Sequence, residues 1–182
     1  MRTQTKPKPD KRTAILDAAE TRARTGGYNG FSFRDLAEDV GIKSASVHYH
    51  FPTKEALGAA LTERYTMRAI ESLGDPAGLN ELEAFDRVAA LFVHANEVED
   101  LMCLCGLFGA ETAGLPEPLV AEVKAYFEAL TSWLSDALQG QNSVLHAEMI
   151  VATLEGALIM SRTSADKDLL RRLQARLRET IA

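Results

Sequence analysis

The sequence predicts an all-α protein of about nine helices, and three observations support this fold class. Apolar residues recur at intervals of three and four along most of the 182 residues, which is the spacing of one face of an α-helix. No segment alternates apolar and polar residues as a half-buried strand would. Glycine, proline and side chains that cap helices divide the chain into segments of helical length.

Composition indicates a globular protein without a membrane span. Hydrophobic residues make up 46% of the chain and charged residues 25%, which is ordinary for a folded domain. We find no apolar run of 18 residues, and residues 1–11 lack the apolar core of a signal peptide. Two cysteines argue against a disulfide framework. We therefore expect a cytoplasmic protein with no membrane contact.

Charge is divided unevenly along the chain. The net charge is −6, yet residues 1–68 hold 12 Lys and Arg against 8 Asp and Glu, whereas residues 69–182 hold 8 against 18. A basic N-terminal third on an acidic remainder can bind phosphate at one end and repel it elsewhere. This distribution favours a nucleic-acid contact confined to the N-terminal part.

The N-terminal segment predicts an arm followed by a first helix. Residues 1–9 are polar, basic and interrupted by prolines, so we expect a disordered basic arm, either a solvated tail or a segment that reaches DNA. The first helix begins at Asp10 or Thr13 and ends at Gly26. Its buried side carries Ile15, Leu16, Ala19 and Ala23.

Residues 32–51 show the pattern of two short helices joined by a tight turn. Ser32 and Asp35 fit a capping box, and Gly41 suits the left-handed residue that ends a helix. The second segment, 43–51, contains no acidic residue and a dense run of hydrogen-bonding side chains. Such a helix suits the DNA major groove, where phosphates and base edges need donors. Candidate DNA contacts are Arg34, Lys43, Ser44, Ser46, His48, Tyr49, His50 and Lys54.

This segment resembles the helix-turn-helix signature of the tetracycline-repressor (TetR) family. The resemblance runs through Phe33, Leu36-Ala37, Gly41-Ile42, residues 45–51, Lys54 and Leu57, with His48 where the family usually has tyrosine. It implies a helix-turn-helix DNA-binding domain at 10–53 and a connecting helix at 54–73. The break at residues 74–78 then separates a regulatory ligand-binding and dimerisation domain at 79–182.

Five further helices are predicted beyond this break, at about 80–97, 100–113, 117–139, 143–163 and 166–181. Pro116 and Pro118 open the third, and residues 139–142 close it. Helices 117–139 and 143–163 carry the most apolar surface. They form either the domain core or, as the resemblance implies, the interface of a homodimer. A two-fold pair of heads would read a palindromic operator in double-stranded DNA.

The resemblance also implies a small-molecule pocket inside the regulatory domain. Small residues at Gly106, Gly109 and Ala110 leave room for a ligand or for a neighbouring helix. Cys103 and Cys105 are either buried hydrophobic residues or reactive thiols; on one helix they would point apart, too far for a mutual disulfide. Candidate pocket residues are His94, Met102, Cys103, Cys105, Phe108, Glu111, Tyr126 and Trp133.

The sequence predicts no enzyme, because it has no nucleophile elbow, phosphate-binding glycine loop or convincing carboxylate pair. We propose no metal site and expect no cofactor. The predicted function is a ligand-responsive, DNA-binding transcriptional regulator, a repressor that an unknown small molecule releases from its operator. Two alternatives stay open: an electrophile or redox sensor acting through Cys103 or Cys105, and a helical small-molecule-binding protein whose head contacts another protein.

Overall fold

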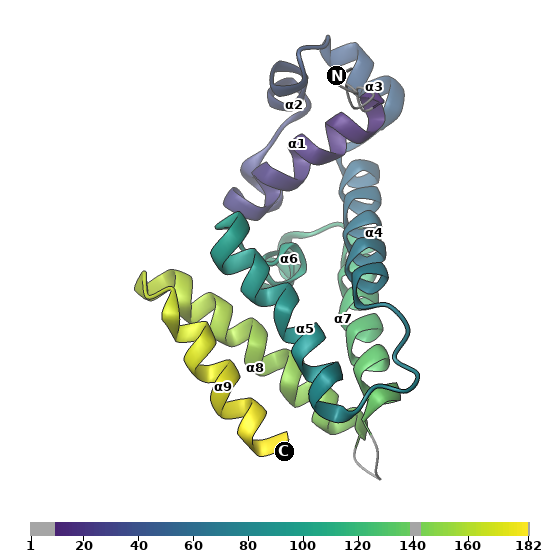
Figure 1. Cartoon of the computed structure of the whole chain (residues 1–182). Coiled ribbons are helices and arrows are strands. Elements are labelled where there is room, and N and C mark those ends of the chain that lie inside the picture. The colour runs from purple at the N-terminus through teal and green to yellow at the C-terminus, as the bar shows by residue number, and fades with distance from the viewer. Residues whose placement is uncertain (1–9, 139–142, 182) are drawn as a thin grey trace, which may run out of the picture.

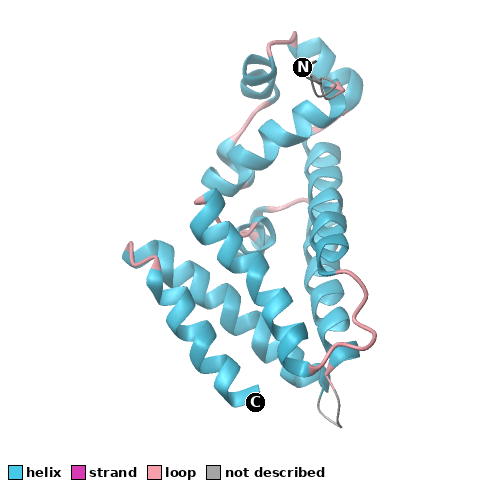
Figure 2. Cartoon of the chain, in the orientation of Figure 1, coloured by secondary structure: helices cyan, strands magenta, loops and turns pink. Residues whose placement is uncertain are grey.

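The computed structural model describes residues 10–138 and 143–181, and this part of the chain contains nine α-helices and no strand (Figure 2). The all-α prediction is therefore confirmed. The predicted arm at 1–9 and the predicted helix end at 139–142 lie outside the described residues.

Three helices form a head at one end of the molecule: α1 (Lys11–Gly26), α2 (Phe33–Val40) and α3 (Ser44–His50) (Figure 1). Asp10 caps α1 by accepting a hydrogen bond from the Thr13 amide at 2.8 Å. The predicted capping box of α2 is present, because Ser32 and Asp35 bond to each other's backbone amides. Gly41 then leaves α2 in the left-handed conformation, at φ 69° and ψ 40°. The head core contains Ile15, Leu16, Leu36, Val47 and Phe51.

Helix α4 (Lys54–Leu73) runs from the head into the rest of the molecule, which we call the body (Figure 1). Thr53 caps it by accepting from the Ala56 amide at 3.1 Å. Inside the body α4 packs along α7 (Glu117–Ala137). This arrangement makes α4 a physical link between the two parts.

The remaining body helices are α5 (Glu81–His94), α6 (Leu104–Ala110), α8 (Ser143–Ser164) and α9 (Asp168–Ile181). Helix α7 packs on α8, α8 packs on α9, and α5 contacts all three. Short 3-10 turns lie at Tyr28–Gly30 (η1) and Thr112–Gly114 (η3). Large side chains that are fully buried in the body include Phe85, Phe92, Phe108, Leu119 and Leu130.

The segment between α5 and α6 differs from the sequence-based expectation. The expected helix at 80–97 is α5 followed by a π-helical turn at Ala95–Glu99 (η2), which ends at Asp100 in a left-handed conformation with φ 56°. The expected helix at 100–113 is shorter, because Cys103 is the N-cap of α6 and its Sγ accepts from the Gly106 amide at 3.4 Å. The prediction of one helix through both cysteines was therefore wrong.

Helix α8 is long and apolar enough by composition to cross a membrane, and no other helix among the described residues is. Core helices of soluble proteins meet the same criterion. In this fold α8 packs against α5, α7 and α9, so its apolar character is explained in part by contacts inside the body.

Candidate nucleic-acid interface and inner cleft

Helix α3 presents its polar side chains outward. Val47 is fully buried and Phe51 is 3% exposed, and these two residues anchor the helix to the head. Lys43, Ser44 and His48 are exposed, and Tyr49 is 85% exposed. A thin apolar seam with a free polar face is the form of a helix that enters the major groove.

Aromatic contacts orient the outer side chains of this helix. The His48 ring lies edge-on to Phe33, with centroids 4.6 Å apart, and the Tyr49 and His50 rings are 5.2 Å apart. A shallow depression of about 360 Å³ runs beside them. It is lined by Lys11, Lys43, Ala45, Ser46, Tyr49 and His50.

The two flanking cations have different surroundings. Arg34 is exposed in the first turn of α2. The ammonium of Lys54 lies 4.6 Å from the ring centroids of both Tyr28 and Phe31, and burial lowers the pKa of Lys54. Lys54 is thus held at the start of α4 by aromatic faces, a geometry that stabilises a cation.

A cleft of about 550 Å³, which we call the inner cleft, lies between the head and the body. Helices α1, α4, α5 and α7 and the turn η2 contribute to it. Of the eight candidate pocket residues, His94 and Tyr126 line it. The other lining residues are Glu20, Arg24, Tyr65, Arg68, Ala69, Ser72, Arg87, Ala90, Leu91, Ala95 and Glu99.

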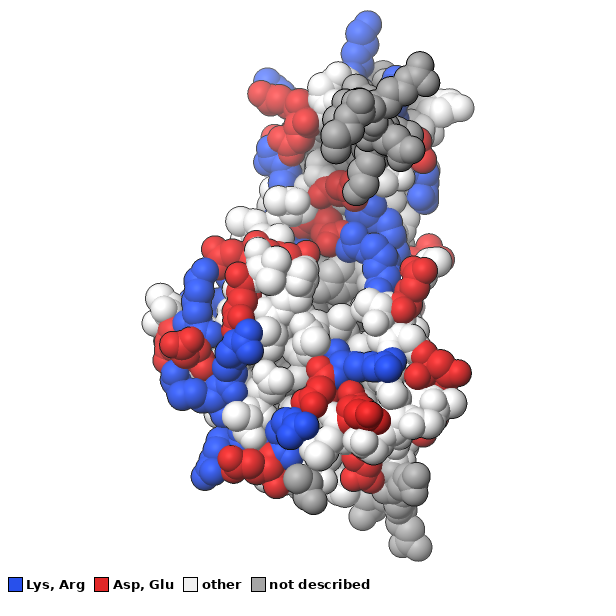
Figure 3. Space-filling view, in the orientation of Figure 1, with Lys and Arg blue, Asp and Glu red and all other residues white. Residues whose placement is uncertain are grey.

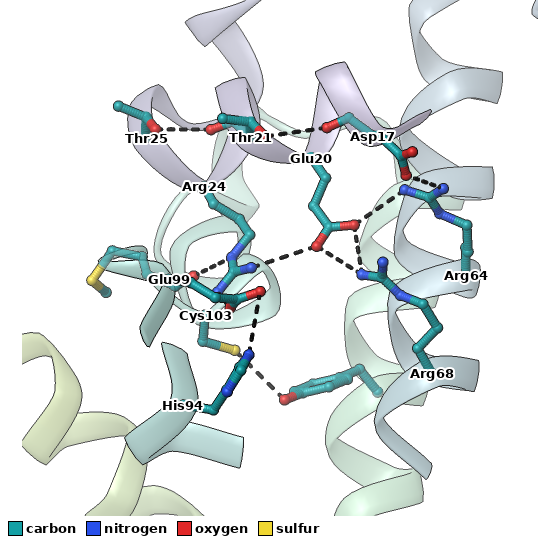
Figure 4. Close-up of polar contacts among 12 residues, drawn as sticks. Asp17, Glu20, Thr21, Arg24, Thr25, Arg64, Arg68, His94, Glu99 and Cys103 are labelled. Carbon is teal, nitrogen blue, oxygen red and sulfur yellow. Dashed lines mark hydrogen bonds and ion pairs between the residues drawn. The ribbon is translucent and has the colours of Figure 1, made fainter. Parts of the chain in front are cut away.

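Ionic side chains at the top of this cleft join α1, α4 and η2; we call Glu20, Arg24, Arg64, Arg68 and Glu99 the neck cluster (Figure 4). Arg24 has only 2% of its side chain exposed. It donates to the Met102 carbonyl and to the Glu99 carboxylate, each at 2.6 Å. Figure 3 shows basic and acidic side chains meeting where the head joins the body.

The Glu20 carboxylate pairs with arginines from two helices, α1 and α4. Arg68 donates to it at 2.6 Å, Arg64 at 3.2 Å, and Arg24 approaches at 3.5 Å. Burial alone would raise the pKa of Glu99, but the hydrogen bond and charge of Arg24 outweigh it and lower that pKa. Removing one partner from such a cluster would leave a partly buried charge uncompensated.

Other candidate pocket residues have structural contacts instead of facing the cleft. Glu111 accepts from the Tyr28 amide at 2.8 Å, and Trp133 donates to the Gly74 carbonyl at 2.7 Å. Phe108 and Cys105 are fully buried in the core. Met102 is half-buried and contributes its carbonyl to Arg24.

Both thiols are buried, and burial favours their protonated form. Burial raises the pKa of Cys103 to about 12 and that of Cys105 well above its usual value. The Cys103 Sγ donates to the Tyr126 hydroxyl at 3.6 Å. Because the thiolate is the reactive form, this geometry gives no support to the alternative of a cysteine sensor.

The neck cluster and Glu155 were not among the residues predicted from the sequence. Glu20 and Arg24 are four residues apart on the buried side of α1. Charged residues on the apolar side of this helix could have indicated a buried ionic cluster. Glu155 on α8 is 8% exposed, and its carboxyl group lies beside the Cys103 thiol. Burial raises its pKa to about 7.

Helix α8 also has an apolar side that the described residues leave uncovered. A groove of about 490 Å³ between α7 and α8 is lined by Phe127, Thr131, Glu148, Val151, Ala152, Glu155, Gly156 and Ile159. Near it, large apolar side chains are 41–57% exposed. We call this surface the α8 face; its exposed members are Val144, Leu145, Met149, Ile159 and Met160.

Comparison with known proteins agrees with this geometry. Residues 15–61 match the family of bacterial regulatory proteins described as the tetR family. Residues 80–176 match the LmrA/YxaF-like C-terminal domain of transcriptional regulators. The chain is 30% identical to the HTH-type transcriptional regulator LmrA of Bacillus subtilis over 172 residues, which cover 85% of this chain and 88% of LmrA.

A solved structure extends the match to the whole fold. The TetR transcriptional regulator from Legionella pneumophila superimposes with a TM-score of 0.90 at 30% identity, covering 97% of this chain and all of that one. The regulator from Agrobacterium tumefaciens has a TM-score of 0.83 at 30% identity, over 94% of this chain and 97% of its own. Together with the outward α3, these matches establish that the chain belongs to the TetR family of bacterial transcriptional regulators.

Proposed function

We propose that this protein is a homodimeric, cytoplasmic repressor that binds a palindromic operator through α3 and releases it when a small molecule occupies the inner cleft. The observation that carries the proposal is the outward polar face of α3, anchored by buried Val47 and Phe51. Among relatives, the IcaR protein of Staphylococcus epidermidis is named as a negative transcriptional regulator, at 27% identity over 128 residues.

The α8 face supports the dimer. Its exposed apolar side chains would be covered by the same surface of a second copy, as in a two-fold interface where one patch meets itself. Ala152 and Gly156 line the groove between α7 and α8, and small residues allow helices to approach closely. Two heads on one dimer would then contact half-sites about one helical turn apart, roughly 34 Å.

The neck cluster supports coupling between ligand and DNA. Arg24 and Glu20 lie on α1 of the head, while Glu99 lies in the body and Arg68 on α4. The same residues line the inner cleft, so a ligand there contacts the groups that hold the head in place. For release, the ligand must bind more tightly to the form that does not fit DNA; a 100-fold preference corresponds to about 2.7 kcal/mol.

A mobility-shift titration with DNA flanking the protein's own gene tests the proposal. We expect a retarded complex with this DNA that survives excess unrelated DNA of equal length and weakens steeply as salt increases. Equal competition by unrelated DNA would reject specific operator binding and favour a head that contacts another protein.

A further inference from the structure

The inner cleft carries more positive than negative charge. Three guanidinium groups line it, from Arg24, Arg68 and Arg87, against two carboxylates, from Glu20 and Glu99. His94 adds an imidazole whose Nε2 lies 3.9 Å from Glu99. Because both carboxylates already bond to arginines, a cationic ligand would have to break an existing pair to be recognised.

Of these three arginines, Arg87 is the one that has no acidic partner among the residues that the structure describes. Its Nη1 donates to the Leu73 carbonyl at 2.6 Å, and it forms no ion pair within residues 10–138 and 143–181. This hydrogen bond to the backbone positions the Arg87 guanidinium and uses only one of its N–H donors. A planar guanidinium with free N–H groups matches the two oxygens of a carboxylate.

The same cleft also offers apolar surface to a ligand. This surface comes from aromatic and aliphatic side chains. Tyr65 and Tyr126 are tilted neighbours, with ring centroids 5.6 Å apart. Leu91 and the small residues Ala69, Ala90 and Ala95 extend this surface. A volume of about 550 Å³ falls in the range of small-molecule sites, roughly 300–1,000 Å³.

We propose that the effector of this protein is an organic anion, with a cyclic apolar body on Tyr65, Tyr126 and Leu91 and its acid group paired with Arg87. The inference rests on the proposed function, because it assigns the chemical class of the ligand that acts at the same cleft. Arg68 lines the same cleft while it is bonded to Glu20 of α1. Binding of a ligand in this cleft is therefore linked to a contact that holds the head.

Matched pairs of acids and amides test the ligand class on the full-length protein. Calorimetric titration would compare benzoate with benzamide, cyclohexanecarboxylate with its amide, and 2-naphthoate with 2-naphthamide. We expect at least one acid to bind at least tenfold more tightly than its amide. A tenfold ratio corresponds to a difference of about 1.4 kcal/mol in binding free energy. The variant Arg87→Gln should abolish this ratio.

The control variant is Arg176→Gln, which removes an arginine whose side chain is 79% exposed on α9 and should keep the ratio. The proposal is overturned if no acid binds better than its amide, or if Arg87→Gln keeps the preference. Circular dichroism would verify that Arg87→Gln is folded; if it is not, Arg87→Lys, which keeps the charge, must retain the preference for acids.

A separate measurement distinguishes this inference from the proposed function. The acid that binds would be added to the complex with operator DNA. Release supports both the anion site and the repressor mechanism. Binding of the acid without any change in DNA affinity supports the anion site and rejects ligand-controlled release, whereas DNA binding without acid preference rejects the anion site alone.

Discussion

At the scale of single residues, Glu155 links the stability of the fold to pH. Its carboxyl group is buried on α8 beside the Cys103 thiol, and its Oε1 lies 2.0 Å from the position of a Cβ added at Gly106. Ionising a buried carboxyl group costs free energy because the charge is removed from bulk water. Burial accordingly raises its pKa from 4.5 to about 7.

We predict that Glu155→Gln stabilises the protein at pH 8. Between pH 4.5 and 7 the unfolded chain loses a proton that the folded chain keeps, so the contribution of Glu155 to stability falls as pH rises, by about 3 kcal/mol in total. Glutamine has no charge to bury. Denaturant unfolding at equal protein concentration should show a gain that is largest at pH 8 and shrinks toward pH 5.

The matched control is Glu63→Gln, an exposed glutamate on α4 that does not line the groove between α7 and α8, which should change stability little at either pH. A gain in Glu155→Gln of the same size at pH 5 and pH 8 would contradict a buried ionisable group.

The cysteines give a second prediction at this scale. Because both thiols are buried and their pKa values are raised, we expect a disulfide reagent to modify neither in the folded protein at pH 7 and both after unfolding. Cys103→Ser and Cys105→Ser should each keep the response of DNA binding to ligand. Rapid modification of one thiol in the native protein, with loss of DNA binding, would revive the cysteine sensor.

At the scale of elements, the end of α1 shows how one glycine joins head and body. Gly27 has φ 71° and ψ −168°, a conformation that side chains oppose. A Cβ there would lie 1.9 Å from the Glu111 Oε1, and the other oxygen of Glu111 accepts from the Tyr28 amide. The turn therefore needs a residue without a side chain.

We predict that Gly27→Ala destabilises the protein by about 2–3 kcal/mol, from backbone strain and a displaced Glu111. The neighbouring Gly26 is helical and has nothing within 4 Å of an added Cβ, so Gly26→Ala should be neutral or stabilising by up to about 1 kcal/mol. Thermal unfolding of the two variants measures this difference in stability. Equal changes in stability would show that the turn does not require glycine at position 27.

Another prediction at the scale of elements concerns a positive charge at the start of α3. Lys43 is exposed at the N-cap of α3, and we expect it to contact a phosphate. Lys43→Ala should then weaken operator binding and reduce the slope of log affinity against log salt by about one. Lys124→Ala, which removes a lysine with 74% of its side chain exposed on α7, should leave both unchanged. An unaltered slope in Lys43→Ala would place this lysine outside the DNA contact.

The elements themselves were largely predictable because their signals are local. The Ser32 capping box and the Gly41 turn depend on neighbours within a few residues, and α7 follows Pro116 as expected. The inner cleft was not predictable in the same way, because Glu20, Tyr65 and Leu91 meet only after folding. Likewise, the periodicity that marked residues 100–113 as helical could not show that Cys103 would be a cap.

At the scale of the whole molecule, two kinds of contact connect the parts. Helix α4 passes continuously from the head to the body and packs on α7 (Figure 1). The neck cluster adds ionic contacts that depend on partners from three elements. Packed apolar contacts resist small displacements, whereas ion pairs can exchange one anion for another. A ligand in the inner cleft therefore acts on the more adaptable of the two connections.

The α8 face leads to a prediction about assembly. Ile159 is 41% exposed and lines the groove between α7 and α8. If this face is the dimer interface, Ile159→Glu places one charge from each protomer in that interface, where burying a charge without a partner is unfavourable. Light scattering at micromolar concentration should show a dimer for the parent protein and a monomer for the variant.

The same test has a matched control in Met67→Glu, which introduces the same charge at an apolar residue that is 64% exposed on α4. This variant should remain dimeric. Operator affinity should fall steeply in Ile159→Glu, because a single head contacts one half-site and loses the effective concentration that the second head supplies. A dimeric Ile159→Glu with full DNA affinity would exclude the α8 face as the interface and require another surface to hold the two heads in register.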